Sequence, residues 1–418
     1  MAKVSSISHV GFSFYKIILL FMAFATLKCW VFWSIPDMLL NLGFFAITIM
    51  FFPLTRCSFD LNNQKKKIIA LLILITFIIN AGLGNLNLYL VAVASASSLC
   101  VLALLNDDCL IELLSLFQKV LVVILAISLI FWILHLMGIN PPSYELTYGE
   151  VEVNGINEDQ YLFQNYYFYL ENRSWMLTGN IDGIIGTIRF HSVFLEPGYL
   201  GILMVFLLTI NKFNWKEKRN WVYIITILFS LSLAGFVMLG FSYITHKMRY
   251  SHKKVLIILL LIIGGLFFYL FSSNYQGGHN VINEGIIERL QYDEEKGIAG
   301  NNRSTNDLDK QFDQFMMSSN VFFGYPRDEK FEAGVGIKAY LVRYGFIGLF
   351  LFLLYMYQLA KKCNRYQGYI LLILYIMMFL RGQVTMFWMG FMLVYVAGLA
   401  LIKRENEKNC VSRALQRV

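Results

Sequence analysis

Long apolar runs recur along this chain, and they constrain its fold more than any other feature. Most are roughly 17–25 residues long, the length that an α-helix needs to cross about 30 Å of hydrocarbon. Charged residues make up only 15% of the sequence, whereas a soluble domain has about 25%. The sequence therefore predicts an all-α, polytopic transmembrane helix bundle. The expected spans are Phe14–Trp33, Met38–Leu54, Ile68–Leu83, Leu86–Leu105, Val120–Met137, Ser192–Ile210, Val255–Phe271, Ile337–Leu359, Tyr369–Leu380 and Thr385–Ile402.

Short basic segments and two long acidic loops predict the orientation of these spans. The long loops, 139–190 and 273–336, carry a net charge of −5 each, and neither contains any of the six cysteines. Short loops rich in Lys and Arg stay in the cytoplasm, so both long loops are expected on the outer side. The basic pI thus reflects membrane topology rather than nucleic-acid binding. Net charges of +3 or +4 fall on Arg56–Lys67, Lys212–Arg219, Lys247–Lys254, Lys361–Arg365 and Lys403–Arg417.

The stretch Trp221–Thr245 has basic segments on both sides, so the chain must enter and leave it from the cytoplasm. A short helical hairpin or re-entrant pair that turns near Ser230–Gly235 meets this condition, because a turn buried among helices can satisfy its backbone groups. This interpretation gives about twelve hydrophobic segments and two cytoplasmic termini. We expect residues 1–418 to form a single integral membrane domain.

Each long outer loop contains one segment with an expected structure. Gln160–Leu170 is polar and aromatic, which favours a short helix at the lipid interface. Ser304–Met317 carries apolar residues at helical spacing, which predicts an amphipathic helix. Its acidic residues are open to two interpretations, a cation site or a solvated face, and the absence of calcium-loop spacing favours the solvated face.

Ionisable residues gather where the first outer loop re-enters the membrane, and such residues are usually functional because they are costly there. If the helix begins near His191, Glu196 lies about one turn deep, with either Arg189, or Ser192 and His191, on roughly its side. Two interpretations remain open at this stage. The pair Arg189 and Glu196 either pins the helix as an ion pair, or Arg189 holds an anion while Glu196 acts as a base or orients a hydroxyl.

Further arginines and one histidine are candidates for an outward-facing site. Arginine presents a planar fork that suits phosphate oxygens, and several arginines over one cavity would form a diphosphate site. His279 is the histidine within the outer loops proper and a candidate general base. Each single residue is alternatively an interfacial anchor or a solvated loop residue. The arginines are Arg173, Arg289, Arg303, Arg327, Arg343 and Arg381.

Two stretches resemble the Wzy-type polysaccharide polymerases, the O-antigen and exopolysaccharide enzymes. In the first, Arg189 is followed by a large apolar span that opens with Phe194-Leu195-Glu196-Pro197-Gly198-Tyr199-Leu200-Gly201. The second runs through Asn302-Arg303, Phe322-Phe323-Gly324-Tyr325-Pro326 and Arg343-Tyr344-Gly345-Phe346-Ile347-Gly348-Leu349. The likeness covers roughly residues 150–360.

The resemblance implies a metal-independent and cofactor-independent glycosyltransferase of the bacterial cytoplasmic (inner) membrane. Such enzymes polymerise undecaprenyl-diphosphate-linked oligosaccharide repeat units on the outer leaflet into O-antigen, capsule or exopolysaccharide. A chain-length regulator and a flippase of the same pathway would be partners. Carried over by position, the resemblance assigns the diphosphate to Arg189 and Arg303, and a supporting role to Glu196.

Other classes of membrane protein remain alternatives. A flippase of lipid-linked oligosaccharide would place charges within the spans and show internal repeats, and neither pattern is present. An O-antigen ligase would have a histidine where this chain has Gly334-Val335-Gly336. An acyl- or phosphotransferase of the outer leaflet would carry histidine–acid signatures, which are absent.

Overall fold

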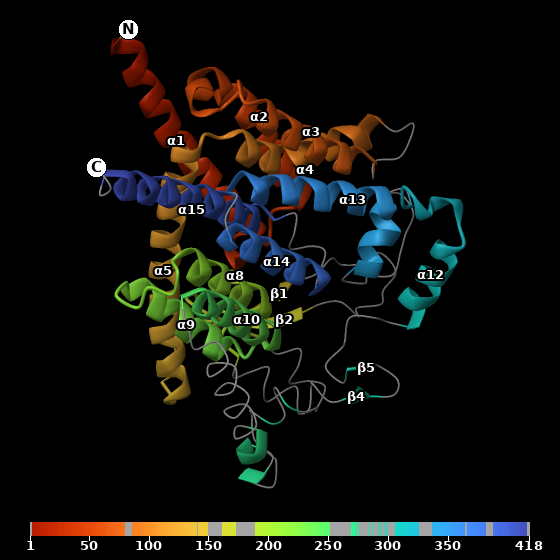
Figure 1. Cartoon of the computed structure of the whole chain (residues 1–418). Coiled ribbons are helices and arrows are strands. Elements are labelled where there is room, and N and C mark those ends of the chain that lie inside the picture. The colour runs from red at the N-terminus through yellow and green to blue at the C-terminus, as the bar shows by residue number, and fades with distance from the viewer. Residues whose placement is uncertain are drawn as a thin grey trace. The chain divides into compact units, whose positions relative to one another are not determined.

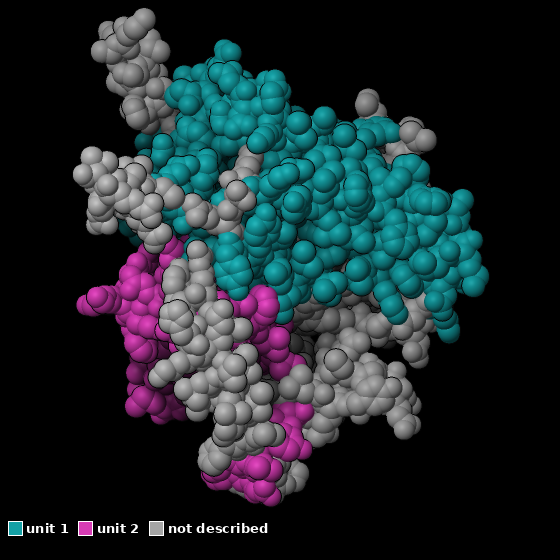
Figure 2. All heavy atoms as spheres, in the orientation of Figure 1, with its two compact units in different colours: residues 1–119, 303–418 teal, residues 120–302 magenta. Residues whose placement is uncertain are grey.

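Helices make up most of the protein that the computed structural model describes (Figure 1). The structure describes residues 2–79, 86–139, 141–148, 161–172, 189–250, 269–272, 274–275, 283, 287, 292–293, 297–298, 306–325, 337–363, 366–381 and 388–415. The chain divides into two compact units, coloured separately in Figure 2. The first consists of Met1–Lys119 with Arg303–Val418, and the second of Val120–Asn302.

The first unit is built from helices with a core rich in buried aromatic residues. Tyr375 and Tyr395 pack with their ring centroids 4.9 Å apart. The Tyr395 hydroxyl donates to the carbonyl oxygen of Met356 at 3.0 Å, which satisfies a polar group that burial would otherwise leave without a partner. Its helices are α1 (Ala2–Thr26), α2 (Asp37–Thr55), α3 (Gln64–Ile79), α4 (Leu86–Leu104), the first part of α5 (Asp107–Leu136), α12 (Asn306–Met316), α13 (Ile337–Cys363), α14 (Tyr366–Arg381) and α15 (Met389–Leu415), with short 3₁₀ turns η1 (Trp30–Phe32), η2 (Arg56–Ser58) and η6 (Ser319–Val321).

The second unit combines the rest of α5 with three helices and a small sheet. Helix α8 packs against both α9 and α10, as Figure 1 shows in green. The sheet is antiparallel in the order β1-β2-β3, and Tyr144 lies opposite Asn165. The elements are β1 (Tyr144–Tyr148), β2 (Tyr161–Asn165), β3 (Leu170–Asn172), α8 (Pro197–Ile210), α9 (Lys218–Ser230), α10 (Leu233–Tyr250) and the short pair β4 (Tyr292–Asp293) and β5 (Gly297–Ile298).

The apolar helices indicate a membrane protein. Three helices among the described residues are long and apolar enough to cross a bilayer, namely Asp37–Ser58, Asp107–Leu136 and Ile337–Lys361. Shorter apolar helices are Ser13–Thr26, Tyr89–Leu104, Pro197–Ile210 and Tyr366–Leu380. Of the expected span Val255–Phe271, only residues 269–271 are among those described. The count of about twelve segments therefore stays a prediction.

The expected turn after Trp221 is confirmed. Helix α9 ends at Ser230, and α10 begins at Leu233. Leu231 caps α9 in the left-handed conformation, with φ of 44°. Leu231 and Ser232 thus join the two helices, inside the predicted range 230–235.

The expected interfacial helix in the first loop is wrong. Tyr161–Asn165 forms strand β2 between β1 and β3. Aromatic residues favour strands, and pairing with Tyr144–Tyr148, which lies well upstream in the sequence, satisfies the backbone groups of this segment. The bundle is therefore not purely helical.

The amphipathic helix of the second loop is confirmed as α12. Phe315 is fully buried and packs with Leu341 and Val342 of α13, and Phe312 joins the same cluster. Asp313 is exposed, in keeping with a solvated acidic face. Met316, which follows Phe312 at helical spacing, is instead 45% exposed.

Candidate functional site

The predicted site residues fall into three groups in the structure. Arg189 and Glu196 belong to the second unit, and Arg343 belongs to helix α13 of the first unit. The remaining candidates lie outside the described residues, except for Arg381, which is the last residue of α14. Their convergence on one cavity therefore stays a prediction; they are Arg173, His279, Arg289, Arg303 and Arg327.

The segment 189–196 that precedes α8 is not helical, which corrects the expected helix start near His191. Helix α8 begins at Pro197, and Glu196 is its N-cap residue with φ of −135° and ψ of 129°. Proline is favoured at the first position of a helix because its missing N–H is not needed there. Glu196 therefore lies directly before the first turn of α8 rather than one turn inside a helix. Helical spacing thus does not place it beside Arg189.

Arg189 is buried and is anchored to the turn between α9 and α10. It is 9% exposed, and its Nε donates to the carbonyl oxygen of Ser230 at 3.0 Å. The next residue is also bonded to the end of α9, because the Phe190 N–H donates to the Phe229 carbonyl at 2.8 Å. The rings of Phe190 and Phe229 both pack on Trp132 of α5. Arg189 is thus held in a defined position by the end of α9.

Ser192 attaches the same segment to the sheet and to α5. Its carbonyl oxygen accepts from the Leu170 N–H of β3 at 2.9 Å. Its hydroxyl donates to Ser128 Oγ at 2.7 Å, and Ser128 in turn donates to the Phe168 carbonyl at 2.5 Å. Ser192 has a φ of 54°, a conformation that costs energy in a residue with a Cβ. The two hydrogen bonds that Ser192 makes hold it in this conformation.

His191 is a candidate that sequence reasoning considered only as a helical neighbour of Glu196. It is 1% exposed, its Nδ1 lies 2.7 Å from the Phe194 carbonyl, and its Nε2 has no hydrogen-bond partner among the described residues. A carbonyl only accepts, so Nδ1 carries the proton and Nε2 carries the lone pair. Burial, together with the charge of Arg189, lowers the pKa of His191 to about 4, although the hydrogen bond to Phe194 opposes this shift. His191 is therefore neutral at pH 7.

Small residues let α8 approach the α9–α10 turn closely. A Cβ at Gly201 would lie 2.8 Å from Ser230 Oγ and 3.2 Å from Ser232 Cβ. A Cβ at Gly235 would lie 3.2 Å from Ser232 Cβ. The glycine at position 201 thus fixes the distance between α8 and the carbonyl that anchors Arg189.

Arg343 lies just before a break in α13. Gly345 has φ of 65° and ψ of −178°, which divides the helix into two parts. The loop Phe322–Tyr325 pairs with this break, since Tyr325 N donates to Val342 O at 2.8 Å and Ile347 N to Phe322 O at 3.0 Å. The backbones approach so closely that a Cβ at Gly324 or Gly345 would overlap the opposite chain. Within the second resembling stretch, the described segments 322–325 and 343–349 therefore pack closely together next to Arg343.

The comparisons with known proteins return no match. No protein-family model, no curated protein and no solved structure matches the chain. In the part of the chain that is described, no three His, Cys, Asp or Glu side chains lie together as a metal site.

Proposed function

We propose that this protein is a glycosyltransferase that polymerises oligosaccharide repeat units carried on undecaprenyl diphosphate. The observation that carries the proposal is the buried Arg189, held by the Ser230 carbonyl directly ahead of helix α8. A permanently charged group is costly to bury. A fixed and dehydrated guanidinium is therefore more characteristic of an anion site than of a membrane anchor.

The chemistry of a diphosphate leaving group suits this arrangement. In the reaction, the bond between the sugar C1 and the diphosphate oxygen breaks, and a new C1–O bond forms to a hydroxyl of the next unit. Negative charge grows on the departing diphosphate, so preorganised donors stabilise the transition state. Arg189 and Arg303 would hold the diphosphate, and the positive N-terminal end of α8 adds to the field.

The remaining candidates would serve the acceptor and the glycan. The acceptor hydroxyl loses a proton, which Glu196 or His279 would take. Arg173, Arg289 and Arg343 would bind further phosphate or sugar oxygens. We place the reaction on the outer leaflet of the bacterial cytoplasmic membrane, where both long loops are expected.

The test is a set of arginine substitutions in cells that depend on this protein for surface glycan. Arg189→Ala and Arg303→Ala should each lower polymerisation by about 10²–10³-fold, as loss of a transition-state donor does. Arg189→Lys keeps the charge but loses the fork, so it should retain part of the activity. Glycan length is read from gels, and protein amount from immunoblots.

Arg219→Ala is the matched control. Arg219 lies in the same unit at the start of α9, where it pairs with Glu217, and it should support glycan of normal length. Normal glycan from both Arg189→Ala and Arg303→Ala would contradict the proposed diphosphate site.

A further inference from the structure

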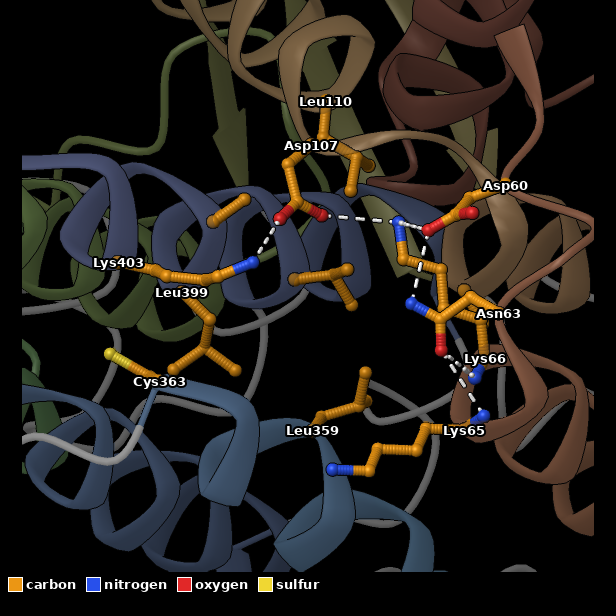
Figure 3. Close-up of a pocket in the computed structure, with 13 residues that line it drawn as sticks. Asp60, Asn63, Lys65, Lys66, Asp107, Leu110, Leu359, Cys363, Leu399 and Lys403 are labelled. Atoms are coloured by element: carbon orange, nitrogen blue, oxygen red, sulfur yellow. Dashed lines mark hydrogen bonds and ion pairs between the residues drawn. The ribbon is translucent and has the colours of Figure 1, made fainter. Parts of the chain in front are cut away.

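The first unit contains a cavity of about 270 Å³ with one charged side and one apolar side (Figure 3). Lysine and aspartate side chains from α3, α5, α15 and the segment just ahead of α3 line the charged side. Leu359 of α13 and Leu399 of α15 belong to the apolar side. Ordinary small-molecule pockets measure about 300–1,000 Å³, so this cavity fits a small group and not an oligosaccharide.

Most of the charges in the cavity neutralise one another. Asp107 lies between two lysines, with Oδ1 3.1 Å from Lys66 Nζ and Oδ2 2.9 Å from Lys403 Nζ. Lys66 is 5% exposed, and it also donates to the Leu105 carbonyl at 2.5 Å and lies 3.7 Å from Asp60. A buried lysine needs such partners, because an unpaired buried charge is strongly destabilising. Lys66 therefore belongs to the structural framework.

Lys65 is the lysine of the cavity that does not take part in this ion-pair network. Three lysines and two aspartates line the cavity, which gives one positive charge in excess. The Lys65 ammonium makes no hydrogen bond or ion pair to any described residue; only its backbone N–H is bonded, to Asn63 Oδ1 at 3.1 Å. Figure 3 shows its side chain extended beside Leu359, away from Asp60 and Asp107.

We propose that this cavity binds a phosphate group attached to an apolar body, as in the headgroup of an anionic phospholipid. The exposed Lys65 and the partly exposed Lys403 hold the phosphate, whose single diester charge balances the excess cation. Leu359 and Leu399 contact the carbon atoms next to it. A ligand of this kind neutralises the charged side of the cavity and covers its apolar side. A free inorganic anion does only the first, and a neutral lipid does only the second.

The position of the cavity in the sequence agrees with a lipid headgroup. Its lining draws on three of the basic segments, Arg56–Lys67, Lys361–Arg365 and Lys403–Arg417, or on residues next to them. These segments are expected on the cytoplasmic side, where basic pockets between membrane helices meet anionic lipids. The inference is independent of the proposed glycosyl transfer, because none of the candidate residues for that reaction lines the cavity.

The test compares thermal unfolding of the full chain in nanodiscs of two compositions. One is pure phosphatidylcholine, and the other contains phosphatidylglycerol. A ligand that binds only the folded state raises its stability, and we expect phosphatidylglycerol to raise the unfolding midpoint by about 2 °C. Lys65→Gln should abolish most of this rise. Lys67→Gln is the matched control, because Lys67 is exposed on the same helix but does not line the cavity.

A third condition distinguishes the source of the phosphate. Glycerol 3-phosphate is added to the phosphatidylcholine nanodiscs, and a rise that depends on Lys65 there, equal to that with phosphatidylglycerol, would identify a soluble organic phosphate as the guest. An equal rise in the wild type and both variants would overturn the proposal. So would loss of the rise in both variants, which indicates general surface charge, or no rise with either phosphate compound.

Discussion

Arg189 and His191 show how burial acts on two basic side chains that are two residues apart. Arginine does not lose its proton in proteins, so it can be buried only with acceptors, and Arg189 takes the Ser230 carbonyl. Histidine can become neutral instead, and His191 does so under burial and the nearby positive charge of Arg189. The segment therefore keeps one fixed positive charge.

A pH dependence of stability follows for His191. Its folded-state pKa of about 4 lies below the ordinary value of about 6.5. As the pH falls through 6.5, the unfolded chain takes up the proton before the folded chain does, so stability falls until about pH 4 and then levels off. Between pH 7.5 and 5, the titration of His191 should lower the free energy of unfolding by about 2 kcal/mol.

His191→Asn keeps a donor for Phe194 and removes the titration. Unfolding of the purified protein at pH 7.5 and pH 5 should show a smaller loss of stability in His191→Asn than in the wild type. His246→Gln, which changes another histidine of the same unit, should behave like the wild type. An identical loss in all three proteins would show that His191 does not titrate in this way.

At the scale of elements, the sequence predicted the elements that depend on local patterns better than those that depend on contacts between distant segments. The α9–α10 turn was predictable because basic segments on both sides require a reversal, and α12 because its apolar residues recur at helical spacing. The start of α8 was misplaced because His191 to Leu195 is apolar enough to continue a helix, although Pro197 marks the true first position. Strands β1–β3 were missed because their stability comes from pairing between segments that are apart in the sequence.

The same distinction holds within the candidate site. Arg189 was recognisable from its predicted place at the membrane boundary. Its acceptor, Ser230, lies 41 residues away, and no local signal joins the two. The contact depends on the close approach of α8 and the turn, which Gly201 permits.

Gly201→Ala should disturb that approach. The added methyl group would lie 2.8 Å from Ser230 Oγ, so the turn must shift and the anchor of Arg189 shifts with it. We expect a loss of about 1–3 kcal/mol in stability, as for overpacked cores, and shorter glycan. Adding Ser230→Ala removes the crowded oxygen but keeps the carbonyl, so the double variant should recover part of both losses.

Gly240→Ala is the control for this pair, since nothing lies within 4 Å of a Cβ at that position on α10. It should leave stability and glycan length unchanged or slightly raise stability through better helix propensity. Wild-type behaviour of Gly201→Ala would show that the two elements are not closely packed.

At the scale of the whole molecule, apolar runs and the placement of charge predict a chain that crosses the membrane repeatedly. Long apolar helices are present in the structure. The orientation rests on the contrast between basic short segments and two acidic long loops. Orientation decides on which side any chemistry at Arg189 takes place.

Thiol labelling tests the orientation directly. No cysteine lies in either long loop, so a membrane-impermeant maleimide should not label the wild type in intact spheroplasts. Asn154→Cys in the first loop should be labelled without permeabilisation, whereas Lys216→Cys in a basic segment should be labelled only after it. The opposite pattern would invert the topology and place the proposed reaction on the wrong side.

The size distribution of surface glycan in a strain that lacks this protein tests the central claim most directly. A polymerase predicts that single repeat units replace long chains on the cell surface, and that the wild-type gene restores the long chains. Loss of even the single unit from the outer face would contradict polymerisation and indicate export of the lipid-linked unit instead.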